Sequence, residues 1–520
     1  MLAPLDYVVL VGYLLGVAAL GMAVRGRQDS ATDYFLGGRD LPWWAVCFSV
    51  IATETSTLTV IGIPAVAYGG TLTFLQLTLG FLIGRVVVSV VLLPRYFRGG
   101  LVTAYALLGQ RFGPAMRRTA SITFMGTRLL ADGVRLFATA IPLKVVADAA
   151  GFSLSYAAII AVIGLITVAY TFVGGLRAVV WVDVVQMMLY IGGALLAIGL
   201  LLQGMPDGAW RHAVAAGKTQ LLDLSFADRD DAFSALLTSP YALPVAVLGG
   251  AVFTMASHGA DHLIVQRLLA CRTLSQGRRA LIGSGVGVVV QFALFLAVGL
   301  LLWVHYGGAS LTDLGLSRGD EVFPKFIVEE MPVGLAGLLL AGIVAAAMST
   351  LSSSLNALAS ATVFDVLGRA PDDARTVTLS RFSTLGWGIV FIGFATLFES
   401  RDNPVVELGL GIASYTYGGL LGAFLLALVS RRARQADALV AFLVTVATMT
   451  WVIFAVWYGP EVGWLVDLRP TPERRAELGL VGLAWPLYTV VGAALCVGVG
   501  TLLGRKVVPR QDTAAPWGWR

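Results

Sequence analysis

Two short stretches of the chain place oxygen-bearing side chains inside long apolar runs. The first runs from Ala52 to Thr59 with the sequence ATETSTLT, and the second from Ala345 to Leu358 with the sequence AAAMSTLSSSLNAL. Polar groups at depth in a bilayer are expensive, and they tend to mark a pathway, a site or an internal pair. A hard monovalent cation prefers neutral oxygens such as the hydroxyls of the second stretch, which is therefore a candidate cation site.

The first stretch would offer backbone carbonyls as well, but only if its helix is broken there. Irregular backbone is tolerated at membrane depth where it is buried in protein or lines a cavity. The alternative is an ordinary helix whose Ser and Thr hydroxyls bond back to their own turn. The hydroxyl residues alone favour that alternative, and the carboxylate of Glu54 favours the break.

In the second stretch the hydroxyls share one face of a helix. Ser349, Ser352 and Ser353 are three and four residues apart, and Thr350 stands beside them. The alternative is a packing face on which small residues let two helices approach closely. The spacing alone does not separate these interpretations.

Three further carboxylates lie in or beside apolar segments. Asp183 is either a cation ligand or an interfacial helix cap. Asp132 is spaced four and three residues from Arg128 and Arg135, which favours an internal pair over a solute contact. Asp261 stands between His258 and His262, but no metallohydrolase motif surrounds them, so we expect no transition-metal site.

Glu54 has no nearby basic residue in the sequence, so a cation, a hydrogen-bonding solute, Arg128 or Arg135 must meet it. We therefore expect a solute with an amino group or several hydroxyls, such as an amino acid, an amine or a sugar, rather than a simple monocarboxylate. In the competing account Arg128 or Arg135 neutralises Glu54 permanently. Ser56, Thr59 and Phe74 would then recognise an acid or a neutral solute.

The composition explains which elements must hold these residues. Of 520 residues 57% are hydrophobic and 13% charged, against roughly 45–50% and about 25% in ordinary soluble domains. Stretches without Asp, Glu, Lys or Arg run over 232–260, 280–312 and 331–364, and about 20 apolar residues suffice to cross a bilayer. The chain is predicted to be an all-α polytopic membrane protein, and its basic residues, which sit in short loops, do not indicate nucleic-acid binding.

Thirteen apolar ranges are predicted to span the membrane. The loops after the first, third and every later odd-numbered range, together with the C-terminus, lie on one side of the membrane. Lys and Arg are more than twice as frequent on that side as on the other. Because cytoplasmic loops are rich in Lys and Arg, this predicts a cell-membrane protein with its C-terminus in the cytoplasm and its N-terminus outside. Residues 321–330 could form a short amphipathic helix on the membrane face. The ranges are 5–24, 43–68, 71–94, 119–147, 154–173, 179–203, 241–266, 280–306, 333–363, 377–398, 404–429, 436–458 and 480–503.

Several segments together resemble the sodium:solute symporter family, which contains sodium-coupled sugar, proline, sialic acid, iodide and vitamin carriers. The resemblance covers almost the whole chain. It rests on Tyr170 to Ala178, on Trp181 to Gln186, on Asp261 with Val265-Gln266-Arg267, on the serine run of 345–358, and on Ser414 to Gly418 with Leu420-Leu421-Gly422.

This resemblance implies a single transporter domain over 1–520 with an inverted repeat of five plus five helices. The repeats would occupy 43–203 and 241–429, and peripheral helices and tails would occupy 1–42 and 430–520. The first helix of each repeat, 43–68 and 241–266, would be discontinuous.

The resemblance also implies ligands for sodium. A core site would use the carbonyls of Ala52, Thr55 and Ala346 with the hydroxyls of Ser349 and Thr350. A second site, present in some members, would use Asp183, Ser349, Ser352 and Ser353. With both sites present, we favour two sodium ions per solute.

For the solute, the resemblance indicates Glu54, Ser56, Thr59, Phe74 and Thr78, followed by the neighbourhood of Ala131; we also count Asp132 among the candidate contacts. Where sialic acid carriers have an arginine, this sequence is expected to have Ala131, which argues against sialic acid. The acidic residue that sugar carriers use near Thr78 is missing.

We therefore expect a secondary transporter, not an enzyme, that imports a small organic solute with sodium by alternating access. Its partners would be the solute, sodium and the lipid bilayer, with no nucleic acid and no required oligomer. Proton-coupled symport is the first alternative, since Glu54 or Asp183 could titrate. A membrane sensor or channel without stoichiometric coupling is the other.

Overall fold

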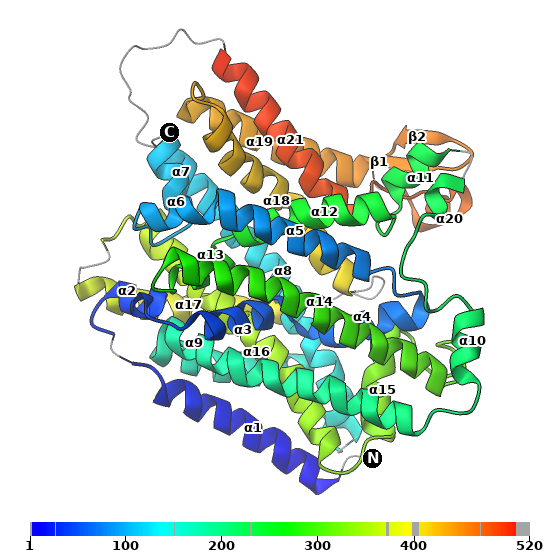
Figure 1. Ribbon diagram of the computed structural model, residues 1–520. Coiled ribbons are helices and arrows are strands. Elements are labelled where there is room, and N and C mark those ends of the chain that lie inside the picture. Colours follow the sequence, from blue (N-terminus) through cyan, green and yellow to red (C-terminus); the bar gives the residue numbers. More distant parts are fainter. Residues whose placement is uncertain are drawn as a thin grey trace.

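The structure is a bundle of helices with one small β-hairpin (Figure 1). It is a computed structural model, and it describes residues 3–26, 28–149, 151–228, 231–370, 374–397, 405–468 and 470–505. The predicted all-α polytopic architecture is confirmed.

The bundle is built from long helices, and shorter helices connect or cover them. The long helices are α1 (Pro4–Ala23), α5 (Leu75–Val91), α8 (Pro114–Ala149), α9 (Tyr156–Gln203), α12 (Leu243–Gly259), α14 (Leu274–His305), α16 (Leu335–Ala361), α17 (Ala374–Leu397), α18 (Val405–Val429), α19 (Gln435–Ala455) and α21 (Trp485–Arg505). The shorter ones are α2 (Ala31–Leu36), α3 (Trp43–Glu54), α4 (Thr57–Gly69), α6 (Leu93–Arg98), α7 (Tyr105–Phe112), α10 (Ala209–Ala215), α11 (Ala232–Thr238), α13 (His262–Leu269), α15 (Val322–Glu329) and α20 (Pro472–Leu478). The strands β1 (Val456–Gly459) and β2 (Gly463–Val466) pair antiparallel.

Helices lie over all thirteen predicted ranges. Within the described residues, nine helices are long and apolar enough to cross a membrane, or ten when the bent pair α3 and α4 counts as one span. The number thirteen stays a prediction. Helices α8 and α18 are not among these candidates, and α9, which covers two predicted spans, is counted as one.

Two of the spans are interrupted, each by two residues. Helices α3 and α4 meet at an angle of 58°, because Thr55 and Ser56 have extended backbone with ψ of 96° and 172°. Helices α12 and α13 are separated by Ala260 and Asp261, and the Asp261 carboxylate accepts a hydrogen bond of 2.9 Å from the Leu263 N–H of α13. Both breaks agree with the expectation for the first helix of each repeat.

Helix α9 contains two predicted spans. Its 48 residues would extend about 72 Å if straight, more than twice the hydrocarbon thickness of a bilayer. Gly175 divides it with φ 57° and ψ −159°, a conformation that is essentially restricted to glycine. At this point α9 touches the backbone of Tyr34 in α2.

Helix α16 lies at the centre of the bundle. In an apolar stretch of 18 residues within the span Leu335–Val366, 89% of the residues are buried, against 17% in the corresponding stretch of α1. Lipid is therefore excluded from nearly all of α16, whereas α1 presents most of its surface outward. The serine-rich stretch of α16 faces protein on every side, as a binding site requires.

The short elements gather at the two ends of the bundle (Figure 1): α10, α11, α15, α20 and the hairpin at one end, α2, α6 and α7 at the other. In α15, Val322, Phe323, Phe326 and Ile327 are all buried. The predicted amphipathic helix is thus present. The expectation that its apolar face meets the membrane is wrong, because that face packs against protein.

Gly175→Ala is expected to destabilise the protein. The added Cβ would lie 2.5 Å from the Tyr34 carbonyl oxygen, and the strained backbone alone costs about 1–3 kcal/mol. Gly192→Ala in the same helix is the control, because no atom lies within 4 Å of its Cβ position. Thermal unfolding of both variants in detergent measures the difference. Equal melting temperatures would contradict a conformational requirement at Gly175.

Candidate functional site

The break between α3 and α4 contacts α16 on both of its sides. The Thr53 hydroxyl lies 3.2 Å from that of Ser353, and the Thr57 hydroxyl donates to the Ile343 carbonyl at 3.2 Å. The two segments therefore run antiparallel, and the backbone of Thr55 faces the stretch of α16 between Ile343 and Ser353. That stretch holds Ala346, Ser349 and Thr350.

All five residues expected to form the core sodium site are buried: Ala52, Thr55, Ala346, Ser349 and Thr350. Because the helix stops at Glu54, carbonyls in the last turn of α3 lack the N–H donors that a continuing helix would supply. The Thr350 hydroxyl donates its hydrogen to the Ala346 carbonyl at 3.2 Å, so the lone pairs of the hydroxyl oxygen remain available to a cation. Carbonyls of an unwound helix and hydroxyls of its neighbour are a known means of binding sodium.

Asp183 is fully buried inside α9, eight residues after Gly175. Its carboxylate accepts hydrogen bonds from the Ser349 hydroxyl at 2.6 Å and from the Ser49 hydroxyl of α3 at 2.5 Å. The interpretation of Asp183 as a helix cap is wrong, because the residue lies within the helix and faces α3 and α16.

A guanidinium that the sequence did not predict completes this cluster. Arg267 of α13 is fully buried, and its terminal nitrogen lies 3.5 Å from the Asp183 carboxylate. The Ser353 hydroxyl, which accepts from Arg267, donates to the Ser349 carbonyl at 2.6 Å. The Ser352 hydroxyl donates to the same carbonyl at 3.1 Å. The structure thus brings Asp183, Ser349 and Ser353 together, while Ser352 bonds to its own helix.

The partners of Glu54 differ from those expected. Its carboxylate forms an ion pair with Arg85 of α5, and His258 of α12 lies 3.3 Å away. Neither Arg128 nor Arg135 provides the charge, because both face Asp132. The sequence contained a signal for the correct pair, since Arg85 and Glu54 are each alone in an apolar span and opposite charges buried in one protein tend to pair.

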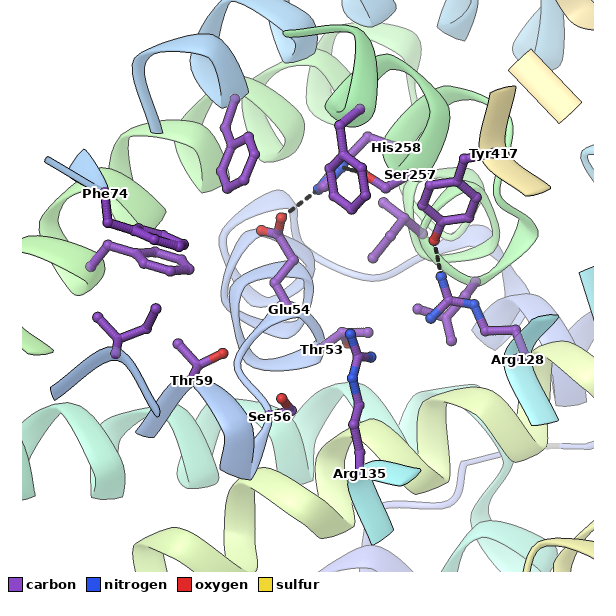
Figure 2. A pocket seen from close by; sticks show the side chains of 16 residues that line it. Thr53, Glu54, Ser56, Thr59, Phe74, Arg128, Arg135, Ser257, His258 and Tyr417 are labelled. Atoms are coloured by element: carbon purple, nitrogen blue, oxygen red, sulfur yellow. Dashed lines mark hydrogen bonds and ion pairs between the residues drawn. The ribbon is translucent and has the colours of Figure 1, made fainter. Parts of the chain in front are cut away.

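A pocket opens beside the α3–α4 break. Four predicted solute contacts line it, namely Glu54, Ser56, Thr59 and Phe74. Figure 2 shows these side chains around one cavity, with Glu54 joined to His258 and Arg128 joined to Tyr417. The remaining lining residues are Thr53, Ile63, Phe81, Arg128, Arg135, Phe253, Ser257, His258, Leu263, Ile264, Phe292 and Tyr417.

Two predicted contacts are not part of this lining. The hydroxyl of Thr78 donates to the Leu75 carbonyl at 2.7 Å, within its own helix. Asp132 is buried and pairs with Arg135 at 2.7 Å and Arg128 at 3.5 Å. The structure therefore shows the internal pair that the spacing favoured, and it does not support Asp132 as a direct solute contact.

Arg128 connects three helices around the second break. Its guanidinium pairs with Asp261, and the Tyr417 hydroxyl of α18 donates to the same carboxylate at 2.7 Å. All three side chains are buried. Of the two tyrosines in this segment, Tyr417 thus faces the pocket; the side chain of Tyr415 lies outside the described part of the chain.

Arg135 has donors that no described residue uses. One terminal nitrogen donates to Asp132 at 2.7 Å, whereas Nε is buried and without a hydrogen-bond partner among the described residues. Figure 2 shows the side chain reaching from α8 toward Thr53. Ala131, which was expected at the position of the arginine in sialic acid carriers, is fully buried and absent from the pocket lining. Arg135, one helical turn later, lines the pocket.

Aromatic rings form much of the apolar wall. Phe74 stacks on Phe292 with ring centroids 5.2 Å apart and planes inclined by 11°. Phe81 and Phe253 continue this wall, with centroids 6.1 Å apart. The pocket therefore offers a flat apolar surface opposite the polar break, which suits a small organic molecule with distinct polar and apolar ends.

Broken helices, buried ion pairs and a central pocket define a secondary transporter rather than an enzyme. The sequence profile described as "Sodium:solute symporter family" matches residues 34–445. The chain belongs to this family, and its coupling ion is sodium.

The relatives of known function are also transporters. The chain is 29% identical to the human sodium/iodide cotransporter over 98% of this chain and 76% of that protein. It is 29% identical to the sodium/sialic acid symporter NanT of Aliivibrio fischeri over 86% and 87% of the two chains. A solved structure of a Na⁺-coupled sialic acid symporter, substrate-bound and outward-open, matches with a TM-score of 0.80 and 26% identity, covering 98% of this chain and 99% of that one.

Separating Glu54 from Arg85 is expected to destabilise the protein strongly. Glu54→Gln leaves the fully buried guanidinium of Arg85 without its carboxylate, which costs about 3–5 kcal/mol. Arg85→Met leaves Glu54, whose side chain is 21% exposed and lies 3.3 Å from His258, and should cost less. The double variant should lose less than the sum of the two single losses. Thermal unfolding of the purified variants in detergent measures this.

Glu329→Gln is the control for that comparison. It breaks the exposed Lys325–Glu329 pair of 2.8 Å, and such surface pairs contribute at most about 1 kcal/mol. Strictly additive effects of Glu54→Gln and Arg85→Met would contradict the pairing.

Proposed function

We propose that this protein imports a small organic acid together with sodium by alternating access. Arg135 carries the assignment of the solute. Its Nε has no hydrogen-bond partner among the described residues, although one terminal nitrogen pairs with Asp132 at 2.7 Å. Glu54 and Arg128 are instead paired with Arg85 and Asp261. A guanidinium with free donors suits a carboxylate, which it binds through two parallel hydrogen bonds.

The other lining residues would hold the rest of the acid. Ser56 and Thr59 supply hydroxyls beside the helix break, and Phe74 with Phe292 supplies the stacked wall. Asp132 acts indirectly by holding Arg135. This proposal replaces the expectation of an amine or a sugar, which rested on an unpaired Glu54. The relatives named for iodide and for sialic acid carry anions, which agrees with the proposed class of solute.

The charges of the core site explain coupling between sodium and an acid. The proposed ligands from Ala52, Thr55, Ala346, Ser349 and Thr350 are neutral, so a sodium ion there adds an uncompensated positive charge to a buried region. A carboxylate in the adjoining pocket balances this charge. Each ligand therefore favours the other, with an expected coupling of about 1–3 kcal/mol.

A second sodium ion would bind at Asp183 with Ser349, Ser352 and Ser353. Its positive charge would be matched by the buried Asp183 carboxylate once Arg267 no longer neutralises that carboxylate, so the site would not depend on the charge of the solute. The two sites share Ser349, and the proposed stoichiometry is two sodium ions per solute.

The proposed arrangement in the cell membrane has the N-terminus outside and the C-terminus in the cytoplasm. Helix α1 begins and α21 ends at opposite ends of the bundle (Figure 1), which agrees with an odd number of spans. Residues 43–203 and 241–429 would form the two core repeats of the single transporter domain, flanked by 1–42 and 430–520. Function requires no oligomer in this proposal.

Ser349→Ala and Thr350→Ala are expected to weaken the binding of sodium at the core site. In proteoliposomes the sodium concentration for half-maximal uptake should rise about 10-fold or more, a loss typical of perturbed metal sites. Ser349→Ala should have the larger effect because both ions use its hydroxyl. Ser360→Ala is the control, since this buried serine of α16 bonds to His262 at 3.1 Å and lies outside both sites.

Unchanged sodium dependence in both variants would mean that this face of α16 only packs. For the stoichiometry, Asp183→Asn should lower the Hill coefficient for sodium towards one. A wild-type coefficient of one at saturating solute would contradict a second coupled ion.

Organic acids are expected to be the solutes that stabilise the purified protein in the presence of sodium. A thermal-shift screen of carboxylates, amino acids, sugars and vitamins, with and without sodium, tests this, because a ligand of the native state raises the melting temperature. Arg135→Met should lower the affinity for the acid that stabilises the wild type most by about 10- to 100-fold, as expected for lost hydrogen bonds to a charged group.

Arg117→Met is the matched control, because Arg117 of the same helix pairs with Asp365 at 2.6 Å and does not line the pocket. Sodium-dependent stabilisation by amines or polyols alone would overturn the proposed class of solute.

A further inference from the structure

Arg267 occupies positions around Asp183 that a cation would need. Its Nε donates to the Ser49 hydroxyl at 3.0 Å, and one terminal nitrogen donates to Ser353 and lies 3.5 Å from the Asp183 carboxylate. The other terminal nitrogen donates to the Leu263 carbonyl of its own helix at 2.9 Å. The guanidinium is thus held by α3, α9, α13 and α16 together.

Sodium and this guanidinium compete for the same atoms and the same charge. The Ser353 oxygen already donates to Ser349 and accepts from Arg267, so its capacity to bind an ion is reduced. Asp183 supplies one negative charge, and a second cation beside Arg267 would leave an excess positive charge in a fully buried place. Arginine does not deprotonate in proteins, so it can yield only by moving.

We propose that the side chain of Arg267 is a tethered cation that fills the second sodium site whenever the ion is absent. The inference rests on the second sodium site proposed above and specifies how that site is regulated. Sodium binds at Asp183 only after the guanidinium swings away from Ser49 and Ser353. In the sodium-free carrier the guanidinium neutralises Asp183, so the buried region does not hold an unpaired carboxylate.

The position of α13, directly after the second helix break, is consistent with this exchange. Asp183 lies on α9 and Ser349 on α16, whereas Arg267 lies on the short helix that begins after the break at Ala260 and Asp261. Discontinuous helices of this kind take part in alternating access. A shift of α13 would withdraw Arg267 while Asp183 and the serines stay together.

Direct binding of radiolabelled sodium to the purified protein, without solute, tests the proposal. Arg267→Ala should bind the second sodium about fivefold more tightly or better, within the usual range of coupling between sites. Arg267→Lys keeps a tethered cation and should stay near the wild-type affinity. Arg117→Ala is the control for loss of an arginine that pairs with a buried carboxylate, that of Asp365, and its sodium affinity should not change.

Free guanidinium provides a readout that a structural role of Arg267 would not change. At millimolar concentration it should compete with sodium in Arg267→Ala, where the position of the side chain is open, and not in the wild type. Arg267→Gln, in which the site stays partly filled, should show weaker competition. The double variant Asp183→Asn/Arg267→Ala keeps the buried charges balanced and should show neither the second sodium nor the competition.

The possible results separate the inference from the function on which it rests. If Asp183→Asn loses one sodium ion while Arg267→Ala binds sodium with wild-type affinity and is insensitive to guanidinium, the sodium site stands and the role of Arg267 is wrong. If Asp183→Asn keeps wild-type sodium binding, the second sodium site is wrong and the inference falls with it. If Arg267→Ala does not fold, the same comparison is made with Arg267→Gln, and the double variant serves as the control that lacks the second sodium site.

Discussion

Buried charges at the centre of this bundle pair across helices, and this constraint fixes much of the architecture. Glu54 at the end of α3 pairs with Arg85 of α5, and Asp183 of α9 lies 3.5 Å from Arg267 of α13. Arg128 of α8 meets Asp261 at the second helix break. A buried ion that loses its partner is strongly destabilising, so these pairs determine which helices can lie side by side.

The same contacts bring the breaks to the middle of the protein. The unwound residues Thr55 and Ser56 carry polar backbone that lipid could not satisfy, and they lie against α16, the most deeply enclosed of the candidate spans in the described chain. One face of this segment meets the hydroxyls of α16, and Ser56 lines the solute pocket. A movement of the break therefore affects the proposed ion site and the pocket together, which is what coupled transport needs.

The partner of Glu54 decides which solute the pocket is proposed to bind. The sequence shows Glu54 as a solitary carboxylate, and an amino group or polyol follows as its natural partner. Arg85, 31 residues later, satisfies that carboxylate, and the unused donors belong to Arg135 instead. The proposed solute therefore changes from one that donates hydrogen bonds to one that accepts them.

The sequence by itself determined the features that depend on residues close together along the chain. Hydropathy located the helices, the polar run from Ala52 to Thr59 located the first break, and the spacing of Ser349, Ser352 and Ser353 placed them on one face. Resemblance to a family added the second break and the proposed sodium ligands. Only the tertiary structure decided the partner of Glu54, the intrusion of Arg267 between Asp183 and Ser353, and the direction of Arg135. Coulomb attraction and hydrogen bonding act across space without any periodicity in sequence, so a pair such as Asp183 and Arg267 becomes visible only when the helices are packed.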